Sequence, residues 1–263
     1  MNSLVESLEH DGYTVEIHRD DDCDSPRSHE SNLGVFLGFP NRSYDIGDSQ
    51  FDPRTYTRTC PVCLAEDRDP QCPRCEGFGE VSPTNEAQLM EWLREDHGAR
   101  VIRKVGMIDH SGISFYMGGG ASAADPGGWD SGTCGYIMDT PERLAEMDCE
   151  LLTDEQIAAS LTSEIEDYSA WSSGDAYGVV IKDGNGDQVH SCWGYIGYDH
   201  VMQSWQDMVP TDPPPALLRT VRLTDEALAL LETLLAPACI GTADDAASTL
   251  AAAVLTTLRA AAG

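Results

Sequence analysis

The chain has 263 residues, of which 45 are acidic and 16 basic, so its formal net charge is −29 at neutral pH. Hydrophobic residues make up 41% of the chain, which excludes wholesale disorder and allows a buried core. The sequence contains no apolar run long enough for a membrane span, and its first residues lack the basic and apolar regions of a signal peptide. We therefore expect a cytoplasmic protein that does not interact with membranes.

Two strands and one helix are predicted in the first hundred residues. Residues 12–18 alternate between apolar and polar side chains, and residues 32–39 form a short apolar run, so both segments favour strands. A helix is expected to start at Ser82 or Thr84 and to stop at Gly98, because capping residues precede a helical pattern and glycine ends it.

Residues 56–80 separate the second strand from this helix and contain two Cys-x-x-Cys pairs. Zinc prefers a tetrahedron of thiolates at about 2.3 Å, and two such turns complete that shell. The total of nine cysteines is odd and the other five are scattered, which argues against a disulfide framework. We predict an inserted zinc knuckle with a structural role, rather than four free thiols or two disulfides. Its ligands would be Cys60, Cys63, Cys72 and Cys75.

The second of these pairs, in "CPRCEGFG", resembles one Cys-x-x-Cys-x-Gly-x-Gly repeat of DnaJ-type co-chaperones. Only one copy matches, because "CPVCLAEDR" lacks the glycines. The resemblance implies a shared knuckle geometry and no shared function.

The middle of the chain alternates between strand and helix patterns. Thr153 is a predicted helix cap, with apolar residues at helical spacing after it. A Gly- and Asn-rich turn at residues 183–187 predicts a hairpin. The predicted strands are 100–109, 112–117, 129–138 and the two arms of the 176–197 hairpin, and the predicted helices are 140–147 and 153–174.

A Pro-rich linker at residues 209–215 is followed by two amphipathic helical patterns in residues 216–263. We therefore predict an α+β body over residues 1–208, with a mixed or antiparallel sheet and flanking helices. The zinc knuckle is an insertion in that body, and the helical pair is a separate C-terminal module.

The acidic residues are spread along the whole chain, and only two of the basic residues are lysines. Direct binding of nucleic acid is not expected, because no basic stripe exists to replace counterions. Three interpretations of the charge remain: adaptation to high salt, mimicry of DNA for a basic cleft on a protein, or a surface for multivalent cations. The even spread favours salt adaptation.

Four residues are candidate catalytic groups: Asp109 and His110 at the end of one predicted strand, Asp130 at the start of another, and His190 on a third. Converging carboxylates and imidazoles could bind a catalytic metal, or His110 could act as a base for a nearby Ser or Cys. The favoured alternative is structural, with Asp109, Asp130 and their serine neighbours forming turns that bond nearby amides.

Six stretches of the chain, taken together, carry a resemblance to a known family. They are "DDDCDSPRSHESNLGVF", "YDIGD", "VGMIDHSGISF", "WDSGTCGYI", "EIEDYSAWSSGDAYGVVI" and "SCWGYIG". In this order they resemble an uncharacterised family of accessory proteins of bacteriophages and conjugative or mobile elements, which implies an intracellular setting in a host and no established reaction. This chain departs from the family pattern in its cysteine insertion, its residues after Pro215, and Thr133 in place of glutamine.

These observations favour an acidic accessory protein that binds a host or viral macromolecule, with a protein as the expected partner. Action against host defence by DNA mimicry is one concrete version. The alternatives are a metal-dependent, hydrolase-like enzyme using Asp109, His110 and Asp130, and a virion-associated structural component. The sequence predicts no oligomeric state.

Overall fold

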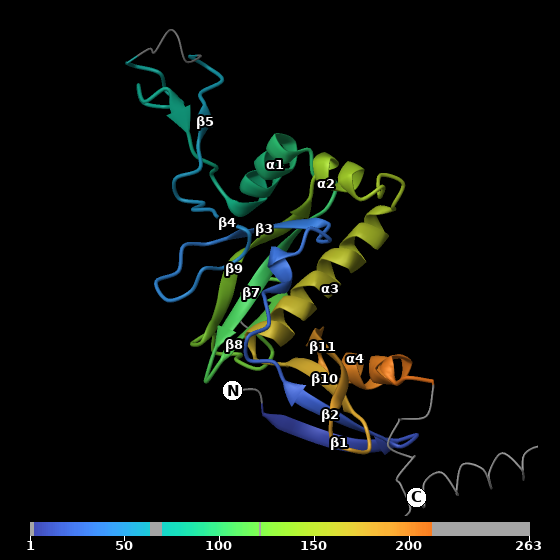
Figure 1. Cartoon of the computed structure of the whole chain (residues 1–263). Coiled ribbons are helices and arrows are strands. Elements are labelled where there is room, and N and C mark those ends of the chain that lie inside the picture. The colour runs from blue at the N-terminus through green and yellow to red at the C-terminus, as the bar shows by residue number, and fades with distance from the viewer. Residues whose placement is uncertain (1–2, 64–69, 121, 212–263) are drawn as a thin grey trace, which may run out of the picture.

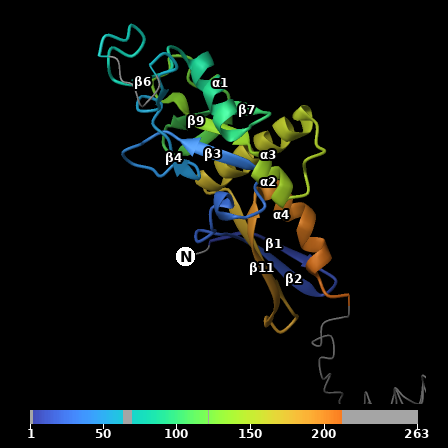
Figure 2. The same cartoon turned by 90° about the horizontal axis from the view of Figure 1, so that it is seen from above.

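The computed structural model describes residues 3–63, 70–120 and 122–211. The described chain has three parts in a row (Figures 1 and 2). A four-stranded sheet lies at one end, a five-stranded sheet lies in the middle, and a small two-stranded ribbon projects at the other end. The α+β class is confirmed, with strands divided between an antiparallel sheet and a mixed sheet.

The four-stranded sheet has the order β1-β2-β10-β11, and all its neighbours are antiparallel. Its hydrophobic face is covered by helix α4 (Tyr198–Ser204) and the 3₁₀ helix η2 (Trp205–Met208). Alternate residues of β2 and β10 point into this core, as the period-two pattern requires. The strands are β1 (Leu4–His10), β2 (Tyr13–Arg19), β10 (Ala176–Lys182) and β11 (Gln188–Ile196).

The five-stranded sheet has the order β4-β3-β9-β7-β8, and only the β3–β4 pair is parallel. The central strand β9 is buried along most of its length. The strands are β3 (Gly34–Gly38), β4 (Ser49–Gln50), β7 (Ile102–Asp109), β8 (Ile113–Met117) and β9 (Ser131–Asp139).

Two helices cover opposite faces of this sheet. Helix α3 (Asp154–Ser172) packs Ile157, Leu161 and Ile165 on one face, and all three side chains are fully buried. Helix α1 (Glu86–His97) packs Leu89 and Leu93 on the other face. The short helix α2 (Pro141–Glu146) follows β9 and adds to the α3 side.

The cap predicted at Thr153 is confirmed, because its hydroxyl accepts from the Gln156 amide and the Gln156 side chain accepts from the Thr153 amide. The stop at Gly98 is also confirmed, with a left-handed φ of 64°. The predicted start of that helix is wrong: Asn85 is the cap, and its side chain accepts from Gln88.

Among the described elements of seven or more residues, two were not predicted from sequence: β1 and α4. The predicted C-terminal helical pair at 216–263 lies outside the described residues, as do residues 212–215 of the predicted linker. Within the described parts of the chain, no helix has the length and apolar character needed to cross a bilayer.

Candidate metal centre

The cysteine-rich segment begins and ends in a short antiparallel ribbon of β5 (Arg58–Thr59) and β6 (Glu80–Val81). The amide of Cys60 donates to the Gly79 carbonyl at 2.9 Å, which continues the pairing beyond the ribbon. The segment therefore leaves the body and returns to it at adjacent positions. Figure 1 shows it extending away from the five-stranded sheet, past α1.

The four cysteine sulfurs converge on one point. All four lie within 4.8 Å of one another, with Cys60 to Cys72 at 3.9 Å and Cys63 to Cys75 at 3.5 Å. A tetrahedral ion at about 2.3 Å from each sulfur requires sulfur–sulfur distances of about 3.8 Å. Disulfides would require about 2.05 Å, and the described cysteines are free thiols. The four residues can therefore hold a metal ion.

The second Cys-x-x-Cys turn depends on unusual backbone angles after Cys75. Glu76, Gly77 and Gly79 all have positive φ values, between 53° and 86°. A Cβ on Gly77 would approach the Pro70 carbonyl oxygen at 3.0 Å, so this position requires glycine. These turns aim the amide of Gly79 at the Cys75 sulfur, at 3.3 Å.

The hydrogen bonds within the cluster shift the acidity of two thiols. Burial raises the pKa of Cys75, but donation from the Gly79 amide and from Cys63 outweighs it and lowers that pKa to about 7. The hydrogen bond of Cys63 to Cys75, together with burial, raises the pKa of the Cys63 thiol to about 12. The arrangement thus favours a thiolate at Cys75, which is the form that binds a metal.

Arg58 attaches the ribbon to helix α1. Its guanidinium lies 4.9 Å from the ring centre of Trp92 and pairs with Glu95 at 2.6 Å and Asp96 at 2.5 Å. Tyr56 donates to the same Asp96 carboxylate, and burial together with this carboxylate raises the pKa of Tyr56 to about 12. The ribbon is therefore fixed to the body by one cluster of polar and aromatic contacts.

The predicted catalytic residues are only partly brought together. Nδ1 of His110 lies 2.7 Å from Oδ2 of Asp130, and the Asp109 amide donates to the Asp130 carbonyl at 2.8 Å. Asp109 and Asp130 line a shallow depression of about 480 Å³ beside the exposed ring of Trp129. Among the described residues, however, the four cysteines form the only group of three or more potential metal ligands.

His190 does not join this group of residues. It lies on β11 of the four-stranded sheet, opposite Ile181, whereas Asp109, His110 and Asp130 belong to the five-stranded sheet and its loops.

The Ser131 hydroxyl follows Asp130 in the chain. It donates to Asp125 and accepts from the Ser122 amide, so it stabilises the loop. Burial raises the pKa of the neighbouring Cys134 thiol to about 12, which makes it a poor nucleophile.

The structure also contains a buried ionic cluster that sequence reasoning missed. Arg27 donates to Asp48 through Nε and Nη2 at 2.9 and 2.5 Å, and to Glu164 through Nη1 at 2.6 Å. Only 5% of the Arg27 side chain is exposed. Burial opposes the charge, but the bonds to Asp48 and Glu164 prevail and raise the pKa of Arg27. The available signal was that all three residues lie in the stretches "DDDCDSPRSHESNLGVF", "YDIGD" and "EIEDYSAWSSGDAYGVVI".

Comparisons of this chain with protein-family models, with curated proteins and with solved structures found no match.

Proposed function

We propose that this chain is an acidic binding protein, stabilised by one structural zinc ion, that attaches to a basic surface on a protein partner. Its setting would be a phage or mobile element acting in the cytoplasm of a host cell. Occupation of a DNA-binding cleft, as in interference with host defence, is the concrete version that we favour. The four cysteines would be the only ligands of the zinc, and thiolate donors in a tetrahedron suit that metal.

The proposal is supported mainly by the ion pairs that the few basic side chains form within the chain. Of the 12 lysines and arginines in the described residues, seven form ion pairs with carboxylates of the same chain. Most of the few positive charges in the described residues are therefore neutralised within the chain, while acidic residues outnumber basic ones by 45 to 16 over the whole sequence. A protein with this charge balance attracts a positively charged partner and repels nucleic acid. The paired residues are Arg27, Arg54, Arg58, Arg100, Lys104, Arg143 and Lys182.

The alternative of a metal-dependent enzyme has weaker support. A four-cysteine site uses all its coordination positions for protein ligands, which leaves none for a substrate. His110 and Asp130 make a close pair, but Asp109 does not complete a three-ligand group with them. The alternative of a virion component depended on the C-terminal helices, which lie outside the described residues.

A competition experiment tests the proposal. The full chain is immobilised and incubated with host lysate, alone, with duplex DNA, or with polyglutamate at the same charge concentration. If the chain mimics DNA, it should retain DNA-binding proteins from the lysate. Duplex DNA should displace these proteins, and polyglutamate should displace them much less. Equal displacement by both polymers would contradict mimicry, because charge alone would then explain retention.

Thermal unfolding at increasing potassium chloride concentration separates this proposal from salt adaptation. A binding protein should fold fully at low salt and change its melting temperature little. A protein adapted to salt should be unfolded or strongly destabilised at low salt, because its carboxylates then repel one another unscreened. That second result, together with no specific retention from lysate, would overturn the proposal.

A further inference from the structure

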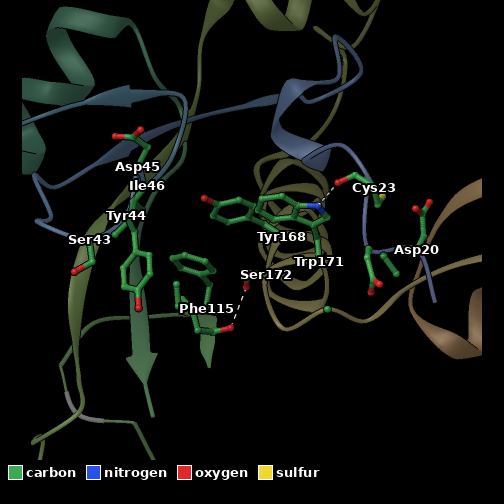
Figure 3. A pocket seen from close by; sticks show the side chains of 14 residues that line it. Asp20, Cys23, Ser43, Tyr44, Asp45, Ile46, Phe115, Tyr168, Trp171 and Ser172 are labelled. Carbon is green, nitrogen blue, oxygen red and sulfur yellow. Dashed lines mark hydrogen bonds between the residues drawn. The ribbon is translucent and has the colours of Figure 1, made fainter. Parts of the chain in front are cut away.

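A cavity of about 500 Å³ opens where the two large sheets meet, at the C-terminal end of α3 (Figure 3). Its wall comes from segments that are far apart in sequence. These are the loop between β2 and the 3₁₀ helix η1 (Pro26–Ser28), the β3–β4 loop, β8, the last turn of α3, and the start of β10. The volume lies within the range of about 300–1,000 Å³ that is typical of small-molecule pockets.

Stacked aromatic rings form one wall of this cavity. Phe115 and Tyr168 stack with ring centres 4.5 Å apart, and Tyr168 and Trp171 stack at 5.7 Å with planes 12° apart. The indole of Trp171 donates to the Cys23 carbonyl at 2.8 Å, which fixes the orientation of the ring. Figure 3 shows a further ring, Tyr44, beside Phe115. The wall is therefore rigid and rich in π-electron density.

The charged side chains that line the cavity all have one sign. Asp20, Asp21 and Asp45 are among its 14 lining residues, and none of the 14 is Lys, Arg or His. Asp20 and Asp45 lie on opposite sides of the stacked rings in Figure 3. The Asp20 carboxylate is positioned by the amides of Asp22 and Gly194, at 3.3 and 3.1 Å.

These features together select the charge and shape of a ligand. Anionic ligands such as nucleotides would meet only negative charge among the side chains that line the cavity. A single metal ion does not fit either, because the acidic residues here form no group of three ligands within bonding reach of one ion. A cation that spans the space between separated carboxylates and rests on aromatic faces fits both observations.

We propose that this cavity binds an extended organic cation, with ammonium or guanidinium groups near Asp20 and Asp45 and a chain lying on the partly exposed rings of Tyr44 and Trp171. The inference stands apart from the proposed function, since it concerns one cavity and not the acidic surface as a whole. The same chemistry could come from a free polyamine or from an arginine side chain of a protein. The choice of probes separates these two sources.

The experiment is calorimetric titration of the full chain with spermidine, with an arginine-containing peptide blocked at both ends, and with a neutral diol as long as spermidine. Saturable one-to-one binding of a cation, with none of the diol, is expected. If spermidine binds more tightly, the source is a free polyamine, and if the peptide does, it is a protein side chain. Binding of neither cation, or equal binding of the diol, would overturn the proposal.

Two variants place the binding in the cavity. Asp45→Asn should weaken cation binding about three- to tenfold, since no partner within the described chain depends on this carboxylate. Tyr44→Leu should weaken it about two- to tenfold by removing an aromatic face while keeping apolar volume. The control is Glu91→Gln, which removes the same charge from the exposed surface of α1 and should leave the affinity unchanged. An equal loss in the control would show general attraction to an acidic surface and would overturn the proposal.

Discussion

Arg27 and Glu164 are 137 positions apart in sequence, yet Nη1 of Arg27 lies 2.6 Å from Oε2 of Glu164. The same carboxylate accepts from the amides of Leu33 and Gly34, at 2.7 and 3.1 Å through Oε1. Glu164 thus binds both the guanidinium and the backbone that enters β3. The contact fixes helix α3 to the first strand of the five-stranded sheet.

Replacing Arg27 with alanine should be strongly destabilising. The change leaves Asp48 and Glu164 without their counter-ion. The site is buried, since only 14% of the Glu164 side chain is exposed. Loss of one partner of a buried ion pair costs about 3–5 kcal/mol in the free energy of unfolding. Urea denaturation measures this difference.

Arg54→Ala is the matched control, because Arg54 also pairs with an aspartate but has 82% of its side chain exposed. Its removal should cause a much smaller loss of stability, because solvent screens an exposed ion pair. Equal stability losses in the two variants would show that burial of the Arg27 cluster has no energetic importance.

Purified protein should contain one equivalent of zinc per chain, and Cys75→Ser should lose it. Elemental analysis of protein prepared without added metal or chelator gives the number directly. The variant should also become sensitive to protease within residues 60–79, while the thermal unfolding of the body changes little, because the segment contacts the body mainly through Arg58 and its neighbours.

Cys192→Ser provides the control for this prediction, since Cys192 lies on β11 and is not part of the four-sulfur group. It should keep the full equivalent of zinc. Retention of metal by Cys75→Ser would place the ion elsewhere in the chain and remove the structural role of the knuckle.

Two glycines on β9 should respond differently to the same change. A Cβ on Gly135 would lie 2.3 Å from the Leu37 carbonyl oxygen and 2.7 Å from the Phe36 ring, whereas a Cβ on Gly132 would have nothing within 4 Å. Gly135→Ala should therefore destabilise the protein by about 2 kcal/mol or more, as forced overpacking does. Gly132→Ala should lie within about 0.5 kcal/mol of the parent. Thermal unfolding of both variants checks the contrast, and similar melting temperatures would contradict the close approach of β3 and β9.

Glu16 on β2 should contribute stability that depends on pH. The hydrogen bond from Lys182 to Glu16, at 2.7 Å, lowers the pKa of the Glu16 carboxyl, and burial raises it. The bond from His18 also lowers this pKa, so the two partners together outweigh the effect of burial. A lowered folded-state pKa means that the stabilisation is present above the ordinary glutamate pKa and is lost as the pH falls through the folded value. Glu16→Gln should therefore cost about 1 kcal/mol at neutral pH and almost nothing in strong acid. Urea denaturation at several pH values measures this difference, and a constant difference across that range would contradict the assignment.

Local patterns in the sequence predicted most of the elements, because each depends on residues near it in the chain. The Thr153 cap, the Gly98 stop and the spacing of the four cysteines are all of this kind. The β1 strand was missed because its apolar residues are largely exposed, with Leu4 at 54%. The signal for it was the Asp11-Gly12 turn, where both residues have positive φ, as a tight hairpin requires.

The cavity and the ionic cluster could not be predicted in this way. Asp20 and Asp45 line the same cavity as Trp171 only because two sheets and one helix meet there. The pairing of β2 with β10 and of β3 with β9 determines that meeting, and both pairings join strands more than 90 residues apart. No pattern within a short window specifies which distant strands become neighbours.

The adjacent ends of β5 and β6 make the cysteine segment a removable module. Because Thr59 and Glu80 already pair across the ribbon, a tight two-residue turn could join them without moving any other part of the body. Ancestral chains could have gained or lost the metal-binding segment in a single insertion or deletion, with no compensating change in either large sheet. The same junction is a site at which a foreign peptide or a fluorescent label could be inserted into this fold.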